Sequence, residues 1–374
     1  MTNQQTRSIH MEKKMEFHGS DLKKVATYYH IPQEQIVCFS ANVNPLGVSE
    51  KAKDKLIQHL DILSRYPDRE YQTLRETIGA YCHTSPEHII VGNGSTELLS
   101  LLISQICAKR ALVLGPTYSE YAREISLTGG TLTEYHLKEE HNFVLDTDDL
   151  LLHLTDAYDL LILCNPNNPT SSAILKSDME RILAHCSQNN IFVMVDETYA
   201  EFAPSISEIT AIPFTKQYQN LMVIRGVSKF FAAPGLRFGY GITGNQTLHE
   251  QLLTHQDPWS LNSVGAFVGE EMLKDEDYIQ QTWKLIDSER TRLYQRLTSL
   301  PSIKVYPPYA NFILIQILKE DVRSLDVFEA AIKEGLMIRD CSSFQSLNGE
   351  FIRFCIMKPE DNDRLLECLW KVLE

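Results

Sequence analysis

The chain has 374 residues, more than one minimal hydrophobic core needs, so we expect two domains or one large α/β domain with an appendage. Hydrophobic residues make up 43% and charged residues 22% of the sequence, which excludes a disordered or fibrous protein. The formal net charge of -14 argues against nucleic acid or an anionic membrane as a partner, although a local basic pocket for a small anion is compatible with it.

The eight cysteines are scattered without CxxC pairs, and most lie in apolar runs. We therefore expect reduced core thiols in a cytoplasmic protein, and we assign no residue to a metal. The polar N-terminal segment has no apolar core, and no run elsewhere approaches the roughly eighteen apolar residues of a membrane helix. Neither secretion nor membrane insertion is expected.

Short apolar runs alternate with longer amphipathic stretches through the first two-thirds of the chain. The predicted strands lie at 89–91, 111–114, 160–164, 191–195 and 221–224. The predicted helices lie at 49–62, 70–82, 95–107, 177–188 and 246–254. This alternation predicts an α/β fold, with a mostly parallel central sheet covered by helices.

A long helical stretch at 264–297 then changes the rhythm. The elements that follow are predicted as strands 303–305, 312–315 and 351–356, with helices at 324–333 and 360–373. We expect these to form a smaller α+β domain. The predicted division is therefore an N-terminal arm at 1–45 that packs on the small domain and the substrate site, a large domain at 46–262 and a small domain at 263–374.

Two chemical groups follow predicted strands. Asp196 ends the apolar run Val193-Met194-Val195, and Lys229 comes after the strand at 221–224. In an open α/β sheet, side chains at the carboxyl ends of the strands line the ligand crevice, so this acid and this lysine can meet there. Taken alone, each residue more often has a simpler role, the acid as a helix cap and the lysine as a solvated cation.

Further motifs surround this pair. In chain order they are NGSTE at 93–97, PTY at 116–118, NPNNPT at 165–170, DETY at 196–199, SK at 228–229 and GLRFGY at 235–240. The motifs and their order resemble the class I/II aminotransferases, which depend on pyridoxal 5'-phosphate (PLP), over essentially the whole chain. The resemblance implies the PLP-dependent transferase fold of type I and PLP as the cofactor.

Matched position by position, the resemblance implies a role for each site residue. Lys229 carries PLP as a Schiff base and shuttles the proton, Asp196 partners the pyridine nitrogen, and Tyr199 donates to the phenolic oxygen. The remaining cofactor residues are Asn168 at the phenolic oxygen, Tyr118 on the ring, and Gly94, Ser95, Thr96, Ser228 and Arg237 at the phosphate. Tyr66 is implied to reach this phosphate from the neighbouring subunit, which makes a homodimer with shared active sites the expected assembly.

Two positions depart from the family pattern. Ser171 stands where a glycine usually follows NPNNPT, which leaves the geometry of this turn open. Gly226 stands where a hydroxyl residue usually precedes the SK pair, which removes one phosphate ligand. Neither change touches the acid or the lysine.

The N-terminal part narrows the substrate. Arg353 lies on a predicted strand where the family places its carboxylate-binding arginine, and a guanidinium suits a carboxylate because it binds both oxygens. The pattern FSANVNPLG at 39–47, preceded by His18-Gly19-Ser20, resembles the threonine-phosphate decarboxylases of cobalamin biosynthesis. This resemblance implies that His18, Asn42 and Arg339 contact the substrate phosphate, although Ser20 departs from the usual second glycine.

We therefore expect a PLP-dependent lyase that decarboxylates L-threonine O-3-phosphate, with L-serine O-phosphate as an additional or main substrate. The bond to Cα that stands perpendicular to the cofactor plane breaks, and a sequence does not fix that torsion. Histidinol-phosphate aminotransferase, or a related transaminase for aromatic amino acids, stays open as an alternative. A non-catalytic PLP-fold binding or regulatory protein is a third reading, and the complete set of cofactor residues argues against it.

Overall fold

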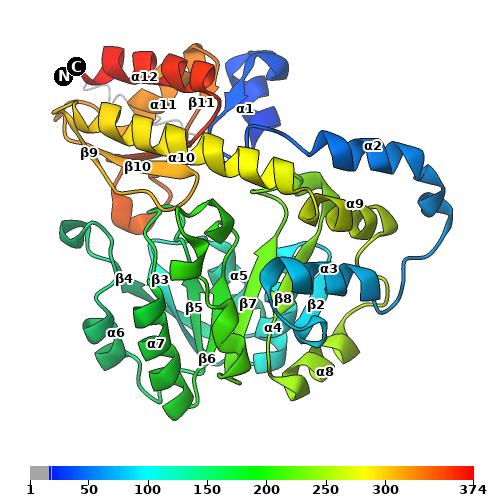
Figure 1. The fold of residues 1–374 in the computed structure, drawn as a ribbon. Coiled ribbons are helices and arrows are strands. Elements are labelled where there is room, and N and C mark those ends of the chain that lie inside the picture. The colour runs from blue at the N-terminus through cyan, green and yellow to red at the C-terminus, as the bar shows by residue number, and fades with distance from the viewer. Residues whose placement is uncertain (1–16, 18) are drawn as a thin grey trace, which may run out of the picture.

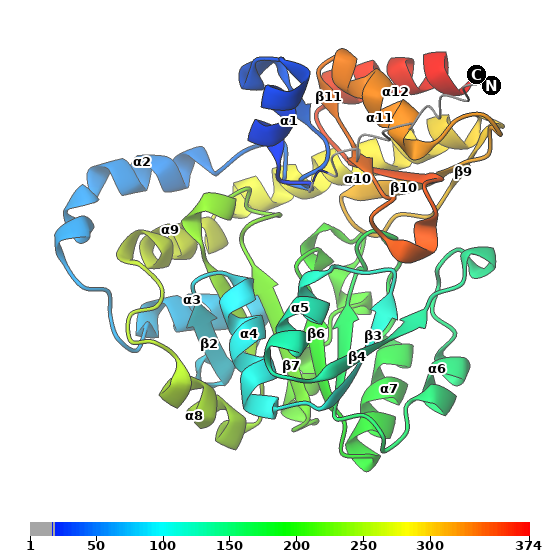
Figure 2. The same ribbon diagram turned by 180° about the vertical axis from the view of Figure 1, so that it is seen from behind.

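The structure is a computed structural model that describes residues 17 and 19–374. It has a large sheet flanked by helices and, above it, a smaller sheet with its own helices (Figure 1). The long helix α10 (Glu276–Thr298) runs along the smaller sheet and reaches toward α2 (Glu50–Gln58) and α9 (Ser263–Leu273), as both views show (Figures 1 and 2).

The large sheet has seven strands in the order β2-β8-β7-β6-β5-β3-β4. Its strands are β2 (Ile89–Gly92), β3 (Arg110–Gly115), β4 (Thr131–His136), β5 (Leu160–Cys164), β6 (Phe192–Asp196), β7 (Leu221–Gly226) and β8 (Gly239–Ile242). Neighbouring strands from β7 through β4 pair in parallel, whereas β8 runs antiparallel to both of its neighbours. The predicted α/β fold with a mostly parallel sheet is confirmed.

Both faces of this sheet are buried, and the sequence of each strand reflects that. In β5, Leu161 and Leu163 belong to one apolar core, whereas Leu160 and Ile162 belong to another. Successive strand residues point to opposite faces, so a strand covered on both sides must be apolar at every position. Helices α3 (Gln72–Cys82) and α7 (Lys176–Gln188) contribute to the first core, and α4 (Ser95–Ile106), α5 (Glu120–Leu127) and α8 (Gln246–His255) contribute to the second.

The smaller sheet has four antiparallel strands in the order β12-β13-β10-β9. They are β9 (Ile303–Val305), β10 (Phe312–Ile317), β12 (Arg339–Asp340) and β13 (Phe351–Cys355), with α11 (Ser324–Lys333) and α12 (Pro359–Leu373) packed nearby. The N-terminal segment joins this part: β1 (Val37–Cys38) pairs in parallel with β11 (Leu336–Met337). Helix α1 (Leu22–Tyr29) lies beside it, and Tyr29 contacts Phe328 of α11.

Two predicted helical segments differ in detail. The long helical stretch expected at 264–297 is helical but divided into α9 and α10, because Asp275 lies between them and caps α10 by accepting a hydrogen bond from the Tyr278 amide at 3.4 Å. An acidic side chain that bonds to a backbone amide competes with helix continuation. The helix expected at 49–62 ends with α2 at Gln58, and a 3-10 turn at Leu60–Ser64 follows.

The sequence prediction also omitted the helices α1, α5 and α6 (Thr147–His153) and the strands β1, β4, β8, β11 and β12. Across the described residues, no helix combines the length and the apolar composition needed to span a membrane. Most of the free cysteines are buried as expected, but Cys107 at the end of α4 is exposed.

Candidate active site

Asp196 lies at the carboxyl end of β6 and is buried. Its Oδ2 accepts a hydrogen bond from the Tyr121 hydroxyl at 2.8 Å, and its Oδ1 accepts from the Thr198 amide at 2.9 Å and the Thr198 hydroxyl at 2.5 Å. Burial, followed by the neighbouring Asp196 carboxylate, raises the pKa of Tyr121 well above its usual value, so its hydroxyl remains a donor. The carboxylate is thus held in one orientation. Sequence reasoning missed Tyr121, although it lies three residues after the PTY motif.

Lys229 follows the carboxyl end of β7, the strand beside β6. Its Nζ donates a hydrogen bond to the Ala41 carbonyl oxygen at 2.6 Å. Burial, followed by repulsion from the Arg353 guanidinium, lowers the pKa of Lys229 from 10.5 to about 8. An amine with such a pKa has a far larger unprotonated fraction near neutral pH than an ordinary lysine, and the unprotonated amine is the form that attacks an aldehyde.

A second group of predicted residues meets the first from the loop after β5 and from the small sheet. Asn168 Oδ1 accepts a hydrogen bond from Nη1 of Arg353, whose Nη2 donates to the Ser40 carbonyl oxygen at 2.6 Å. The Tyr199 hydroxyl accepts from Asn42 Nδ2 at 3.3 Å, and burial raises the pKa of Tyr199. These residues come from segments far apart in the sequence, and the fold brings them together at one edge of the large sheet.

Some polar atoms in this group lack partners. Within the described residues, Arg353 Nε and Asn42 Oδ1 are buried without a hydrogen bond. Leaving a buried polar atom unpaired costs about 1–3 kcal/mol, so native proteins almost always satisfy such atoms. A polar ligand that enters between the arm and the small sheet would remove this cost.

The expected phosphate corner lies at the start of α4. A Cβ atom at Gly94 would lie 2.4 Å from Nη2 of Arg237, so the guanidinium occupies the space that a side chain at Gly94 would fill. A Cβ atom at Gly226 would lie 3.5 Å from the Ser95 hydroxyl, which brings the turn before Ser228 to the same corner. Free amide groups at a helix N-terminus and a nearby guanidinium together suit a phosphate. Thr96 is exposed on the same first turn of the helix.

Tyr118 lies close to the acid and to this corner. Its ring packs edge-on against Tyr121 with the ring centres 5.6 Å apart. Burial is the main cause that raises the pKa of Tyr118 to about 12, and the charges of Asp196 and Arg237 both act on it. An acid, an aromatic ring and an anion-binding corner suit the pyridine nitrogen, the ring and the phosphate of PLP, so these residues fit that cofactor.

Three predicted residues remain. Tyr66 is 83% exposed, and its ring centre lies 5.0 Å from that of Trp259. Arg339 pairs in register with Arg353 on the adjacent strand and donates to the Phe17 carbonyl oxygen and to the Ser343 hydroxyl. His18 lies outside the described residues.

The geometry at Ser171, which the sequence left open, is the left-handed backbone conformation, with φ of 60°. Its hydroxyl accepts a hydrogen bond from the Ala310 amide at 2.9 Å, and its carbonyl oxygen accepts from the Tyr309 amide at 3.0 Å. The residue therefore keeps the backbone shape that favours glycine and adds a hydrogen bond to the loop before β10.

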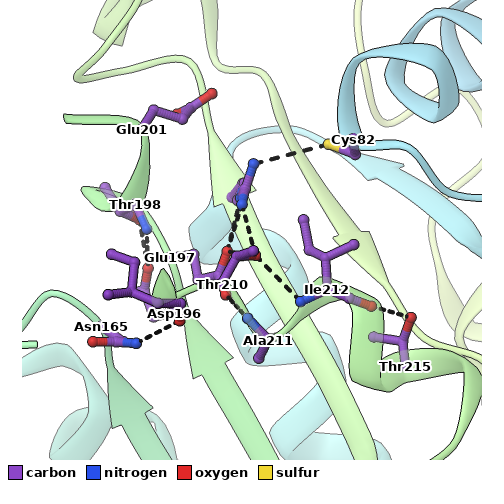
Figure 3. Close-up of polar contacts among 12 residues, drawn as sticks. Cys82, Asn165, Asp196, Glu197, Thr198, Glu201, Thr210, Ala211, Ile212 and Thr215 are labelled. Atoms are coloured by element: carbon purple, nitrogen blue, oxygen red, sulfur yellow. Dashed lines mark hydrogen bonds and ion pairs between the residues drawn. The ribbon is translucent and has the colours of Figure 1, made fainter. Parts of the chain in front are cut away.

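A buried ion pair supports the ends of β6 and β7 (Figure 3). Arg225 Nη2 lies 2.6 Å from Glu197 Oε2, and Glu197 Oε1 accepts from the Ala211 amide at 2.5 Å. Glu197 directly follows Asp196, and Arg225 lies four residues before Lys229. The pair thereby holds together the two strand ends that carry the acid and the lysine.

Such a site, at the carboxyl edge of a sheet with this topology, defines a PLP-dependent enzyme of fold type I. Comparison with known proteins gives the family. The chain belongs to the class I and II aminotransferase family, whose model matches residues 34–369, and its cofactor is PLP.

Relatives within this family have different activities. A threonine-phosphate decarboxylase from Salmonella typhimurium is 34% identical over 95% of this chain and 96% of the relative. A histidinol-phosphate aminotransferase from Methanosphaera stadtmanae is 29% identical over 99% of both chains. Among solved structures, the histidinol-phosphate aminotransferase from Clostridium acetobutylicum superposes with a TM-score of 0.84 at 31% identity, covering 89% of this chain and 98% of that one.

A further solved structure has a lower sequence identity. The L-threonine-O-3-phosphate decarboxylase from Porphyromonas gingivalis superposes with a TM-score of 0.78 at 21% identity, covering 90% of this chain and 98% of that one. At this identity the likeness concerns the fold alone. The comparisons therefore establish the family and the fold, and they include both decarboxylases and aminotransferases.

Proposed function

We propose that this enzyme decarboxylates L-threonine O-3-phosphate to the corresponding aminopropanol phosphate for cobalamin biosynthesis. The observation that carries the proposal is the pairing of two arginines on the small sheet. Arg339 of β12 and Arg353 of β13 are directly opposite each other in the antiparallel register, so their side chains leave the same face of the sheet. The substrate carries two anionic groups, a carboxylate and a phosphate, and each arginine suits one of them.

The surroundings of the two guanidinium groups indicate which arginine suits the carboxylate and which suits the phosphate. Arg353 is buried against the Phe312 ring, 5.3 Å from its centre, and contacts Asn168, so it lies with the residues assigned to the cofactor. Arg339 points toward the N-terminal segment at Phe17 and is partly exposed. We assign the Cα carboxylate to Arg353, and the phosphate to Arg339 with Asn42 and His18.

The residues of this chain then act as follows. When bound, PLP accepts the electron pair that is released as a bond to Cα breaks, and the bond perpendicular to its ring is the one weakened. Asp196 would hold a proton at the pyridine nitrogen, and Asn168 and Tyr199 would donate to the phenolic oxygen. The Cα carboxylate would leave as CO₂, and the protonated amino group of Lys229 would deliver one proton to Cα and become the free amine, so the product keeps the phosphate and the substrate's amine.

L-serine O-phosphate lacks only one methyl group of this substrate. A single methyl gives about 1–3 kcal/mol of discrimination in an apolar pocket, so we expect measurable turnover of both compounds.

The second candidate is a histidinol-phosphate aminotransferase, and the likeness to the enzyme from Clostridium acetobutylicum favours it. Histidinol phosphate has a phosphate but no carboxylate, so the buried Arg353 would serve only the second substrate, an amino or keto acid. Added 2-oxoglutarate separates the two activities, because a transaminase forms glutamate and a decarboxylase releases CO₂ without any keto acid. A non-catalytic protein would show neither product.

We also propose that the enzyme is a homodimer. Large apolar side chains are exposed along α2 and the turn after it, namely Ile57, Leu60, Leu63 and Tyr66. This segment extends away from the rest of the chain at one side of the molecule (Figure 1). A second copy would cover these side chains, and its phosphate corner would receive Tyr66.

The direct test measures CO₂ release from phosphothreonine, phosphoserine and unphosphorylated threonine. We expect the phosphorylated substrates to be preferred and 2-oxoglutarate to be unnecessary. Arg339→Ala should raise KM for the phosphorylated substrates about 10- to 100-fold, because a hydrogen bond to a charged group is lost. The KM for unphosphorylated threonine should stay nearly unchanged. Lys229→Ala, as the control, should abolish turnover. If Arg339→Ala keeps the full preference for phosphorylated substrates, the phosphate assignment is wrong.

A further inference from the structure

We propose that Asn44 is a positioning residue for Lys229, and that the arm segment 41–44 clamps this lysine at both its side chain and its backbone. The inference rests on the proposed role of Lys229 as the lysine that carries PLP. It holds for a decarboxylase and a transaminase alike.

The backbone side of the clamp consists of two hydrogen bonds from one residue. The Asn44 amide donates to the Lys229 carbonyl oxygen at 3.0 Å, and Asn44 Nδ2 donates to the Phe230 carbonyl oxygen at 2.7 Å. Asn44 is 2% exposed. The carbonyl groups of Lys229 and Phe230 are thus held by one residue that lies 185 and 186 positions earlier in the chain.

The Asn44 side chain is itself fixed by α10. Its Nδ2 lies 3.0 Å from the Tyr278 hydroxyl and 2.9 Å from the Thr282 hydroxyl, and its Oδ1 accepts from the Leu46 amide at 3.0 Å. Thr282 is fully buried, and the Tyr278 hydroxyl also donates to the Gly47 carbonyl oxygen at 2.7 Å. Both ends of the amide group therefore have partners, so its orientation is determined.

The side-chain end of the clamp is the Ala41 carbonyl oxygen, which accepts from Lys229 Nζ at 2.6 Å. The neighbouring Ser40 carbonyl oxygen accepts from Arg353 Nη2 at 2.6 Å. One short segment thus fixes the lysine relative to the arginine assigned to the carboxylate. Whenever the lysine amine is free during turnover, Ala41 gives it a fixed acceptor from which it reaches Cα. Proton transfer depends steeply on this distance, and a displacement of about 1 Å costs on the order of 100-fold in rate.

The test uses the PLP-loaded enzyme and expresses kcat per bound cofactor, so that misfolded protein does not count. Asn44→Ala should lower this kcat about 10- to 100-fold with a nearly unchanged KM, because the substrate contacts remain. Without substrate, it should also move the pH midpoint of the cofactor absorbance change by about half a unit or more, because that midpoint depends on the placement of the lysine nitrogen.

A pair of substitutions at Thr282 separates the hydrogen bond from packing. Thr282→Val keeps the shape and removes the hydroxyl, and it should lower kcat about 3- to 10-fold and shift the absorbance midpoint. Thr282→Ser keeps the hydroxyl and removes a methyl, and it should stay within about 2-fold of the wild type. This pair decides the question even if Asn44→Ala fails to fold.

Asn362→Ala is the matched control. Asn362 is another buried asparagine, whose side chain accepts a hydrogen bond from the Met357 amide and donates one to the Glu289 carboxylate. The Asn362→Ala variant should be less stable than the wild type, but the pH midpoint of its cofactor absorbance change should not move. Equal losses in Thr282→Ser and Thr282→Val, or an unmoved midpoint in Asn44→Ala and Thr282→Val, would overturn the proposal. Failure of the role of Lys229 would look different, because Lys229→Ala would then keep the absorbance band.

Discussion

At the scale of single residues, the lowered pKa of Lys229 gives a pH prediction. The free amine binds an aldehyde, and the pKa of about 8 means that most of this amine is unprotonated above that pH. For the cofactor-free protein, the rate of PLP attachment should therefore rise with pH and level off above about pH 8. An ordinary lysine, with a pKa near 10.4, would keep gaining rate well beyond that point.

Stopped-flow absorbance from pH 6.5 to 10 measures this rate, and N-acetyl-lysine methylamide as a model amine corrects for the ionisation of PLP itself. The same lowered pKa also determines how the stability of the cofactor-free protein changes with pH. The unfolded chain binds more protons than the folded chain between about pH 8 and 10.5, so this group makes the cofactor-free protein more stable as the pH rises through that window. A rate that follows the model amine across the whole range would contradict the lowered pKa.

The sequence predicted the residues assigned to the cofactor and the substrate better than the residues that hold them in place. Asp196, Lys229, Asn168 and Arg353 occur in motifs with specific spacing, and the structure brings them to one edge of the sheet. Tyr121 and Asn44 act through side-chain directions and through partners far away in the chain. No local pattern encodes such a partner, because it exists only once the elements have packed.

At the scale of elements, Ser171 joins the turn after β5 to the loop before β10. The hydroxyl bond to the Ala310 amide spans the large and the small sheet, and it lies close to Asn168 in sequence. A residue other than glycine in the left-handed region costs roughly 1–2 kcal/mol, and the two bonds to residues 309 and 310 offset this cost.

Two substitutions test this link. Ser171→Ala keeps the backbone cost and leaves the buried Ala310 amide unpaired, so it should lower the free energy of unfolding by about 1–3 kcal/mol. Ser171→Gly also loses the bond but relieves the backbone, so its loss should be smaller by about 1 kcal/mol. Denaturant unfolding of the two variants and the wild type measures the difference. A glycine variant that is less stable than the alanine variant would refute the account.

Element prediction succeeded where a strand is buried on both faces and failed where it is not. Strand β4 is at the sheet edge with mostly exposed or half-buried residues, so its sequence TLTEYH lacks an apolar run. Strand β8 contains Gly239 and Gly241, and glycine is depleted in strands. The structure explains both glycines: a Cβ atom would lie 2.4 Å from the Ser95 amide nitrogen at Gly239 and 2.1 Å from the Met222 methyl group at Gly241.

At the scale of the whole molecule, the resemblance predicted the fold because the motif order fixes which loops meet at the sheet edge. The division of the chain at residues 45 and 262 stays a prediction. The described N-terminal segment has contacts with two parts of the chain. Its strand β1 pairs with β11, whereas Asn44 bonds to Phe230, which follows β7, and to Thr282 of α10. This segment therefore links the C-terminal part of the chain, through β11, to the end of β7 in the large sheet.

The shared active site of the proposed dimer gives the last prediction, which concerns two chains at once. Tyr66 is exposed in one chain, whereas Lys229 lies in the interior of the site. If Tyr66 serves the partner's phosphate corner, Tyr66→Ala should weaken PLP binding and lower activity at limiting PLP. Lys229→Ala should be inactive at any PLP concentration.

Mixing the inactive Lys229→Ala chain with the weakened Tyr66→Ala chain distinguishes the possible arrangements. In a mixed dimer, one of the two sites combines an intact Lys229 with an intact Tyr66 from the other chain. Random exchange of equal amounts makes half of the dimers mixed, so about a quarter of the wild-type activity should return at limiting PLP. Size-exclusion chromatography with light scattering checks that the sample is dimeric. The control is a mixture of Lys229→Ala with Asp196→Ala. Both of these residues belong to the same chain's site, so no intact site can form in that mixture. If activity fails to return in a verified mixed dimer, Tyr66 acts within its own chain or not at all, since each chain would then need both residues itself.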